Sequence, residues 1–578
     1  MKKLAKYLKA YKVLLVIGPL FKLAEAILEL LLPYFMSKII DVGVANQDRD
    51  YVLKMGGIML ITAVIGVCSA LVCQYSASLV SQGVGTDIRN DLFQHIATFS
   101  NRELDSFGTS SLVNRITNDV NQVQLGVAML IRLVIRAPFL IIGGFIMAII
   151  IDVRLSLILL IVIPIFILIL TTTMKKTVPL YRAVQKKLDH IALVLRENMS
   201  GVRVIRAFAK VDHEKRRFDI PNKEYEDNII RVGRISALLN PLTSLVMNVS
   251  IGAIIWFGGI RVNEGTTSTG EIIAFIGYVA QILAALIVVS QLVVIYTKAF
   301  ASAGRVVEVF ETKATIINSD FTSHNEGTTE YAVEFKKVSM SYEVNREYDV
   351  KDINFKVKKG ETIGIIGGTG SGKSTIINLI PRFYDVSVGG VFVDGRDVRD
   401  YQVEELRSKI GVVPQNTTLF TGTIGENIRW GKEDATEEEV QKAAEIAQAS
   451  EFIDRLPEGY NTKISRGGVN VSGGQRQRLT IARALVRKPE ILILDDSFNA
   501  LDFMTDAALR SALKQTAKDM TVFIVSQRAS TIQGADQIIV LNDGDVVGLG
   551  KHEDLMQQCE VYQEICESQM QNKHGGAA

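Results

Sequence analysis

Residues 362–375 read TIGIIGGTGSGKST, and this stretch decides the fold of the C-terminal part of the chain. An apolar run predicted to be a β-strand leads into the pattern G-x-x-x-x-G-K-S at 367–374, and a run predicted to be helical follows. Glycines in such a loop let backbone N–H groups turn inward around phosphate oxygens, and the helix N-terminus adds the positive end of its dipole. The stretch therefore predicts a phosphate-binding loop made of Gly367, Gly368, Thr369, Gly370, Ser371, Gly372, Lys373, Ser374 and Thr375.

A second motif supplies the acidic residue that accompanies such a loop. Residues 490–496 read EILILDD, and aliphatic residues that end in aspartate predict a buried strand with Asp495 at its carboxyl end. In phosphate-loop nucleotidases the lysine reaches the β- and γ-phosphates, while the loop serine and such an aspartate hold Mg²⁺. Lys373, Ser374 and Asp495 are therefore predicted to bind a nucleotide and Mg²⁺.

The region around these motifs alternates short β-rich runs with helical segments, which is typical of an α/β domain with a mostly parallel sheet. The expected strands cover 332–335, 362–366, 391–393, 491–494, 522–525 and 538–541. We predict that this domain spans residues 331–570 and that a short tail, 571–578, follows it. A polar, turn-rich stretch at 314–330 is predicted to be a linker.

The first half of the chain differs, because its apolar residues are concentrated in long runs. A helix needs about 20 apolar residues to cross the hydrocarbon core of a membrane. One apolar run, 13–36, is interrupted by Lys22, Glu25 and Glu29, and the run 137–151 reaches spanning length only when it is extended back past two arginines. Residues 1–313 are therefore predicted to form an α-helical membrane domain with six spans. The runs without Asp, Glu, Lys or Arg are 55–86, 137–151, 155–174, 235–260 and 272–297.

Two long loops, 87–125 and 175–234, read as helical and predict stalks that continue the spans into the cytoplasm. We expect a turn or a short crosswise helix at the tip of each stalk, at 100–111 and at 211–221. The second loop and the N-terminus are rich in Lys and Arg, so the positive-inside rule predicts that both termini are cytoplasmic. The whole chain has 64 Lys and Arg against 62 Asp and Glu, and this balance gives no basic excess for binding nucleic acid.

Between the two phosphate motifs, residues 471–475 read VSGGQ and are followed by the helical stretch LTIARALV. VSGGQ resembles the LSGGQ signature of the nucleotide-binding domain of ATP-binding-cassette (ABC) transporters, with Val in place of Leu. Tyr342 resembles the family's aromatic residue that stacks on adenine, Gln415 the glutamine of its Q-loop, and Asp502 the aspartate of its D-loop. Residues 197–210 resemble the same stretch of six-span ABC exporters, so the resemblance covers nearly the whole chain.

The resemblance implies an ABC exporter half-transporter, in which a six-span membrane domain with long cytoplasmic stalks is fused to an α/β P-loop domain with an ABC signature subdomain. Two such chains would pair in the bacterial cell membrane and hold two ATP molecules with Mg²⁺ between them. Gln415 would join Ser374 and Asp495 as a metal ligand, and the stalk tips would be coupling helices. The residues implied to contact the ATP bound by the partner are Ser472, Gly473, Gly474 and Gln475.

Two positions depart from the family's pattern at the chemistry itself. The family has a catalytic Glu where this chain has Asp496, and a switch His where this chain has Gln527. Aspartate is one methylene shorter, so its carboxylate would lie about 1.5 Å short of the attacking water, and a misplacement on the order of 1 Å can cost about 100-fold in rate. Glutamine can donate a hydrogen bond but cannot carry the charge that histidine acquires. Both changes weaken hydrolysis and leave the ATP-binding residues intact.

This combination resembles the degenerate-site subunit of bacterial heterodimeric multidrug ABC exporters. It implies a partner half-transporter with an intact catalytic Glu and switch His, whose hydrolytic site the signature motif of this chain would complete. The alternative is that Asp496 and Gln527 are tolerated in a working site. Export of lipids or peptides is an alternative to export of amphipathic small molecules. An ATP-gated channel or a regulatory subunit is an alternative of another class.

Three charged residues of the first span, Lys22, Glu25 and Glu29, lie on one helical face. Each charge costs about 2.5–3.5 kcal/mol at the middle of a bilayer, so this face should point to the bundle interior or to water. One interpretation is the wall of a substrate cavity that attracts lipophilic cations. The other is a structural Lys22–Glu25 pair with an interfacial Glu29. Arg132 and Arg136 of the third span are expected to serve packing or to anchor the head groups of membrane lipids.

Overall fold

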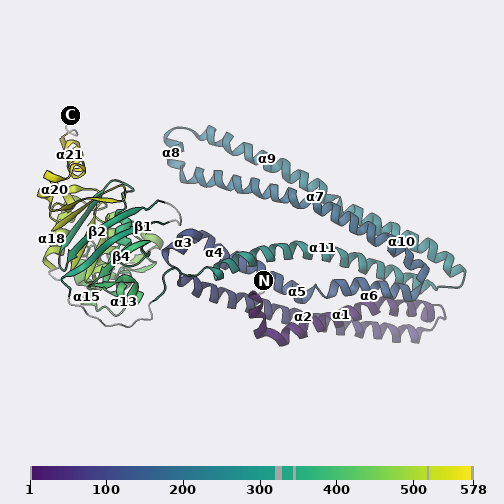
Figure 1. Ribbon diagram of the computed structural model, residues 1–578. Coiled ribbons are helices and arrows are strands. Elements are labelled where there is room, and N and C mark those ends of the chain that lie inside the picture. The colour runs from purple at the N-terminus through teal and green to yellow at the C-terminus, as the bar shows by residue number, and fades with distance from the viewer. Residues whose placement is uncertain (1–2, 319–328, 343–346, 517–519, 575–578) are drawn as a thin grey trace. The chain divides into compact units, whose positions relative to one another are not determined.

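The computed structural model describes residues 3–318, 329–342, 347–516 and 520–574 (Figure 1). The chain divides into two compact units. The helical unit comprises residues 1–97 and 109–312, and the sheet unit comprises 98–108 and 313–578. The predicted linker at 314–330 falls largely outside the described residues, and the predicted domain boundaries stay predictions.

The helical unit consists mainly of long helices. Among the described residues, five stretches are long and apolar enough to cross a membrane, and they coincide with five of the six predicted spans: 49–97, 109–151, 153–200, 211–263 and 269–311. The sixth, α1, is one continuous helix of 27 residues, about 40 Å long, but its charged residues keep it outside this set. Its role as a span stays a prediction. The elements are η1 (Leu4–Tyr11), α1 (Lys12–Lys38), η2 (Ile39–Val44), α2 (Arg49–Ala97), α4 (Thr109–Asn114), η3 (Arg115–Asp119), α5 (Val120–Arg132), α6 (Arg136–Ile151), α7 (Val153–Ser200), α8 (Val202–Ala207), α9 (Val211–Ala237), α10 (Leu239–Asn263) and α11 (Thr269–Glu311).

Polar side chains fix where two of these helices begin. Asp152 Oδ1 accepts hydrogen bonds from the backbone N–H groups of Arg154 and Leu155 at the start of α7. Ser268 and Glu271 form a capping box at the start of α11. Such caps satisfy N–H groups that have no partner within the helix, so they define the ends of the spans.

The tip of the first stalk is confirmed, whereas the second tip lies elsewhere than predicted. The short helix α3 (Asn101–Phe107) forms inside the expected stretch and begins with a capping box. In the second stalk the short helix is α8, and the predicted tip at 211–221 is instead the first part of α9. The reversal occurs earlier because Gly201 ends α7 and Ala209 adopts a left-handed conformation with φ 51°. Pro221, the last residue of the predicted tip, lies inside α9.

The sheet unit contains the predicted mostly parallel sheet, which has six strands in the order β12-β11-β3-β10-β9-β6. All neighbours are parallel except β11 and β12. A second, antiparallel sheet has the order β2-β1-β4-β5, and a short third sheet pairs β7 with β8. The strands are β1 (Tyr331–Met340), β2 (Val350–Lys358), β3 (Thr362–Gly367), β4 (Val388–Val393), β5 (Arg396–Asp397), β6 (Ile410–Val413), β7 (Gly422–Thr423), β8 (Lys463–Ile464), β9 (Ile491–Asp495), β10 (Thr521–Val525), β11 (Gln537–Asn542) and β12 (Asp545–Gly550).

Both faces of the central strands of the six-stranded sheet are buried, whereas the edge strand β12 has no fully buried residue. Successive residues of a strand point to opposite faces, and in β9 Leu492 and Leu494 join one apolar cluster while Ile491 and Ile493 join the other. This explains why the central strands read as unbroken aliphatic runs. The remaining helices of the sheet unit are α12 (Lys373–Leu379), α13 (Val403–Ser408), α14 (Ile424–Arg429), α15 (Glu437–Ile446), α16 (Ser450–Ile453), α17 (Gly473–Leu485), α18 (Phe503–Thr516), α19 (Ala529–Ile532), α20 (His552–Gln558) and α21 (Glu560–His574).

Candidate nucleotide-binding site

Four loops that follow parallel strands meet at one edge of the larger sheet. Val525, the last residue of β10, is level with Asp495, the last residue of β9, and β3 and β6 end at the same edge. Ligands of open α/β sheets bind at this carboxyl edge. The structure therefore brings together predicted site residues from four separate parts of the chain. They are 367–375 after β3, Asp496 after β9, Gln527 after β10 and Gln415 after β6.

The phosphate loop is organised around its lysine and two crowded glycines. Lys373 Nζ donates hydrogen bonds to the carbonyl oxygens of Gly367 at 3.0 Å and Gly368 at 2.5 Å, which places the ammonium group inside the loop. Gly372 has φ 94°, and a Cβ atom there would lie 2.5 Å from Val350 Cγ1. A Cβ atom on Gly367 would lie 2.3 Å from the backbone oxygen of Leu541. Larger residues at these two positions would therefore push the loop out of shape.

Ser374 and Asp495 form the predicted metal-binding pair. Ser374 Oγ donates a hydrogen bond to Asp495 Oδ2 at 3.2 Å. The pKa of Asp495 is raised, mainly by burial and further by the negative charge of Asp496. The hydrogen bond from Ser374 and the positive charge of Lys373 lower it in part. A hydroxyl, a carboxylate and the amide oxygen of Gln415 are hard oxygen donors of the kind that Mg²⁺ prefers. The residues present therefore fit Mg²⁺.

Asp496, at the position of the catalytic Glu, is already engaged by neighbouring amides. Its Oδ2 accepts a hydrogen bond from Gln415 Nε2 at 3.2 Å, and its Oδ1 accepts one from Asn499 Nδ2 at 2.6 Å. The backbone of Asp496 is left-handed with φ 51°, a conformation that aspartate tolerates better than most residues. Sequence reasoning missed the role of Asn499, although its place in the D-loop motif, where the family has Ser, was a usable signal.

Gln527, at the position of the switch His, is exposed and lies on a segment fixed by the C-terminal helix α21. Gln569 Nε2 donates to the backbone oxygen of Gln527 at 2.7 Å, and Gln569 Oε1 accepts from the backbone N–H of Ala529 at 2.9 Å. The side-chain amide of Gln569 thus hydrogen-bonds the backbone at both ends of the segment 527–529. Sequence reasoning missed Gln569, because a single glutamine in a distant helix carries no local signal.

Tyr342 lies beside the helix that follows the phosphate loop. Its hydroxyl donates to Thr375 Oγ1 at 3.2 Å, and its backbone N–H donates to Asp349 Oδ2 at 2.9 Å. Its ring meets the ring of Tyr384 edge-on, with the ring centroids 4.9 Å apart. These contacts fix the tyrosine near the phosphate loop, and stacking on adenine stays a prediction.

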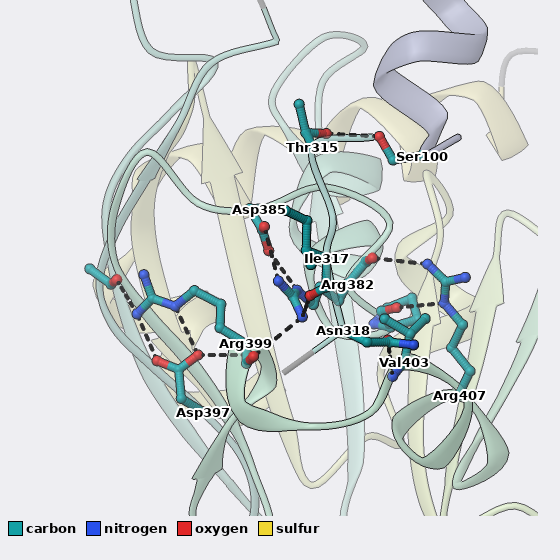
Figure 2. Close-up of polar contacts among 12 residues, drawn as sticks. Ser100, Thr315, Ile317, Asn318, Arg382, Asp385, Asp397, Arg399, Val403 and Arg407 are labelled. Atoms are coloured by element: carbon teal, nitrogen blue, oxygen red, sulfur yellow. Dashed lines mark hydrogen bonds and ion pairs between the residues drawn. The ribbon is translucent and has the colours of Figure 1, made fainter. Parts of the chain in front are cut away.

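The sheet unit holds the tip of the first stalk and the chain segment that follows α11. Tyr384 donates a hydrogen bond to Asp105 Oδ2 of α3 at 2.6 Å. Figure 2 shows Ser100 next to Thr315, with 2.9 Å between their hydroxyl oxygens. The same view shows Ile317 and Asn318 held on the sheet unit, where the Ile317 carbonyl accepts from Arg382 and Asn318 Oδ1 accepts from the backbone N–H of Val403.

The signature residues form a regular helix start. Ser472 and Gln475 make a capping box at the N-terminus of α17, with hydrogen bonds of 2.9 and 3.2 Å. Asp502 caps α18 in a similar way by accepting from the backbone and the hydroxyl of Thr505, and these bonds lower the pKa of Asp502. Both groups therefore hydrogen-bond within their own elements, and their contact with a nucleotide on a partner stays a prediction.

In the helical unit, the three charged residues in the interior of α1 are paired. Lys22 Nζ lies 2.7 Å from Glu25 Oε2, and Arg136 Nη2 donates to Glu29 Oε2 at 2.7 Å. The Lys22–Glu25 pair of the second interpretation is present, and Glu29, which that interpretation placed at the interface, pairs with Arg136. Glu29 and Arg136 line a cavity of about 230 Å³. Its use as a substrate cavity stays a prediction.

A helical unit with membrane-spanning helices joined to a P-loop sheet unit is the architecture of an ATP-driven membrane transporter. Comparison with known families agrees: an ABC transporter transmembrane region matches residues 15–286, an ABC transporter domain matches 350–499, and a P-loop domain matches 432–571. An uncharacterised ABC transporter ATP-binding protein of Bacillus subtilis, YfiB, is 39% identical over 574 residues, which cover 98% of each chain. The chain belongs to the ABC transporter family.

Within this family the chain is an exporter half-transporter, with its membrane domain and nucleotide-binding domain fused. YgaD of Bacillus subtilis, described as a putative multidrug export ATP-binding/permease protein, is 32% identical over 590 residues and 98% of each chain. A solved structure of a bacterial Atm1-family ABC exporter with ATP bound has a TM-score of 0.75 over 97% of this chain and 98% of that chain, at 23% identity. The predicted family and fold class are confirmed, and the activity class is ATP hydrolysis coupled to transport.

Proposed function

We propose that this chain is one subunit of a heterodimeric, ATP-driven exporter of amphipathic compounds in the bacterial cell membrane, with both termini in the cytoplasm. Its own phosphate loop binds ATP at a degenerate site that hydrolyses slowly. Its signature motif completes the hydrolytic site of a partner half-transporter, which carries the catalytic Glu and the switch His. The pair exports its substrate only when both chains are present.

The observation that carries this proposal is the contrast between an intact phosphate loop and an altered catalytic pair. Lys373, Ser374 and Asp495 are of the residue types that ATP and Mg²⁺ require, with Lys373 Nζ inside the phosphate loop and Ser374 Oγ hydrogen-bonded to Asp495. Asp496 is shorter than the usual Glu, and two amide groups already bind its carboxylate. Misplacing a catalytic group by about 1 Å is enough to cost about 100-fold in rate, so this pattern favours binding without rapid hydrolysis.

Each residue of the site has a defined task in this proposal. Lys373 binds the β- and γ-phosphates of ATP, and Tyr342 stacks on the adenine base. Ser374, Asp495 and Gln415 hold Mg²⁺, which when bound neutralises charge on the phosphate oxygens. Gln527 donates a hydrogen bond toward the γ-phosphate but cannot take up a proton as histidine does.

The substrate class is an amphipathic small molecule, and the similarity to YgaD, a putative multidrug export protein, supports it. Lipids and peptides are the alternatives within the same class of transporter. An ATP-gated channel or a regulatory subunit is the alternative of another class, in which slow hydrolysis is the working state. Transport into inverted membrane vesicles against a substrate gradient separates a pump from a channel.

The first test is to purify the chain without a partner and to measure ATP binding and steady-state hydrolysis. We expect ATP to bind, with a turnover at least about 100-fold below that of the same chain co-purified with its partner. Lys373→Ala, which removes the phosphate-binding ammonium group, supplies the background. Rapid hydrolysis with transport by the chain alone would show that no partner is needed.

The second test restores the usual catalytic pair. Asp496→Glu together with Gln527→His should raise hydrolysis by the chain alone at least about tenfold, because a longer carboxylate reaches the attacking water. The matched control is Asp496→Gln with Gln527→His, which has the same side-chain length but no general base and should stay slow. Equal rates in the two variants would mean that the geometry of residue 496 does not limit hydrolysis.

A further inference from the structure

The backbone that carries Gln527 is anchored to β3 on both sides. Before it, the backbone N–H of Ser526, a buried residue, donates to the carbonyl oxygen of Ile365 at 3.1 Å. After it, Ile532 of α19 packs against Gly364, where an added Cβ atom would lie 2.7 Å from Ile532 Cβ. Gln527 itself is exposed at the carboxyl edge of the sheet. Neither of the two anchors involves Gln527 or the two residues after it.

The start of α19 takes its cap from another helix. The first backbone N–H groups of a helix have no partner within it, and the side chain at the N-cap position usually accepts from one of them. Within the described part of the chain, the N-cap residue Arg528 makes no such hydrogen bond. Gln569 Oε1 of α21 instead accepts from the backbone N–H of Ala529 at 2.9 Å, while Gln569 Nε2 donates to the backbone oxygen of Gln527 at 2.7 Å. One planar amide group therefore holds the peptide groups on both sides of Arg528.

Gln569 is in turn held by the buried face of α21. Tyr562, Cys566 and Gln569 follow one another at spacings of four and three residues, so they lie on one helical face. Tyr562 and Cys566 are buried, at 0% and 1% exposure, and belong to one apolar cluster of the sheet unit. The Tyr562 hydroxyl also lies 2.8 Å from His552 Nδ1 of α20. Because this face is buried, α21 presents the Gln569 amide from a fixed position.

We propose that Gln569 is a positioning residue for recognition of the γ-phosphate of ATP and that it acts through Gln527. The proposed function assigns to the Gln527 side chain a hydrogen bond toward that phosphate, and the present inference rests on this assignment. A hydrogen bond weakens steeply when donor and acceptor are misaligned, so a Gln527 backbone that is free to shift loses part of the contact. ADP has no γ-phosphate. Gln569 therefore raises the affinity for ATP relative to ADP without touching either nucleotide.

The plainer alternative is that Gln569 only fastens α21 to the rest of the sheet unit. Its loss would then lower the stability of the chain and weaken the binding of ATP and ADP alike. The ratio of the two affinities separates these readings, because only a residue that acts on the γ-phosphate contact changes it.

The test measures this ratio for the full chain in lipid nanodiscs with Mg²⁺ present. ADP and the non-hydrolysable β,γ-imido analogue of ATP compete with a fluorescent ADP analogue, so turnover does not enter. We expect Gln569→Leu to lower the affinity for the imido analogue relative to ADP about fivefold and to leave ADP affinity within about twofold. Gln563→Leu is the matched control. Gln563 Nε2 of the same helix donates to the backbone oxygen of Met556 at 2.7 Å, so this variant removes a similar hydrogen bond away from Gln527 and should keep the ratio.

Two more variants ask whether Gln569 acts through Gln527. Gln527→Leu should lower the ratio about as much as Gln569→Leu does, and the chain with both substitutions should lose little more, because both remove the same contact. Gln569→Glu keeps the side-chain length and the hydrogen bond from Ala529, and loses only the donor to the Gln527 oxygen. It should lower the ratio about two- to threefold, and it replaces Gln569→Leu if that variant folds poorly.

The inference is wrong if a Gln569 variant that still binds ADP keeps the ratio of the unchanged chain, or if its affinity for ADP falls as much as that for the imido analogue. It is also wrong if Gln527→Leu leaves the ratio unchanged, or if the two Leu substitutions lower it additively. The measurement needs neither a partner nor hydrolysis. Rapid ATP turnover by the chain alone would therefore overturn the proposed heterodimer and leave this result standing.

Discussion

Asp495 is subject to opposing demands from stability and from metal binding. Its carboxyl group is half-buried, and burial raises its pKa. A carboxyl group whose pKa is higher in the folded chain than in the unfolded chain stabilises the fold only at low pH, and this contribution is lost as the pH rises through the folded pKa. In the proposed site Mg²⁺ would bind the ionised form of Asp495, so the form that the proposed function requires is the one that lowers stability at neutral pH.

We therefore expect Asp495→Asn to raise the melting temperature of the nucleotide-free chain at pH 7 and to abolish the gain in ATP affinity that Mg²⁺ provides. Asparagine keeps the shape and can still accept the hydrogen bond from Ser374, but it carries no charge. Thermal unfolding and the binding of a fluorescent ATP analogue, with and without Mg²⁺, measure the two effects. Asp502→Asn is the matched control: hydrogen bonds lower the pKa of Asp502, so its neutralisation should lower the melting temperature. A drop in both variants would contradict this account of Asp495.

At the scale of elements, two tyrosines connect α3 to the nucleotide-binding region. Asp105 of α3 accepts from the hydroxyl of Tyr384, the ring of Tyr384 meets that of Tyr342, and Tyr342 hydrogen-bonds Thr375 just after the phosphate loop. Each contact is direct. If a base stacks on Tyr342 as proposed, we expect a change in the position of this ring to move Tyr384 and, through it, α3.

Tyr384→Phe should uncouple these elements with little effect on the site itself. The ring contact with Tyr342 remains, but the hydrogen bond to the Asp105 carboxylate, a type of bond that contributes about 1.5–3 kcal/mol, is lost. We expect ATP affinity within about twofold of the unchanged chain and transport by the paired complex reduced at least about fivefold. Tyr460→Phe removes a hydroxyl from another half-buried tyrosine of the same unit and serves as the control. Unchanged transport by Tyr384→Phe would rule out this route.

The elements that could be predicted from sequence are those whose pattern is continuous along the chain. The aliphatic strands β3, β9, β10 and β11 were found because burial on both faces leaves only apolar residues between their ends. Strand β2 was missed because only alternate residues of VKDINFKVK are buried and its lysines face solvent. The second stalk tip was placed at 211–221, whereas the structure makes the turn at Gly201 and Ala209, ahead of α9.

The residues of the candidate site also fall into two groups, those that the sequence predicts and those that it does not. Residues in short linear motifs, such as Lys373 and Asp495, could be predicted because the chemistry fixes both residue type and spacing. Asn499 and Gln569, which hold Asp496 and the segment after Gln527, could not, since their roles depend on contacts made only in the folded chain.

At the scale of the whole molecule, the presence of a membrane domain and an α/β domain could be predicted from composition. Which residues belong to each unit could not. Residues 98–108 lie within the predicted membrane domain and yet belong to the sheet unit, because Ser100 and Asp105 make their polar contacts there. These hydrogen bonds join residues more than 200 positions apart. No local sequence pattern predicts such contacts.

The proposed heterodimer makes the two nucleotide sites unequal, so substitutions in this chain should have unequal effects on the complex. Gly473 is exposed and a side chain there meets open space, so Gly473→Asp should fold normally and even suit the N-terminus of α17. Its carboxylate would repel the ATP of the partner's hydrolytic site, and we expect steady-state hydrolysis by the tagged complex from native membranes to fall at least about 100-fold.

Lys373→Ala removes ATP only from the slow site and should lower steady-state hydrolysis by the complex less than about tenfold. The neutral control Gly473→Ala should remain close to the unchanged complex. In a homodimer each substitution would strike both sites, so an equal loss for Gly473→Asp and Lys373→Ala would contradict the asymmetric pair.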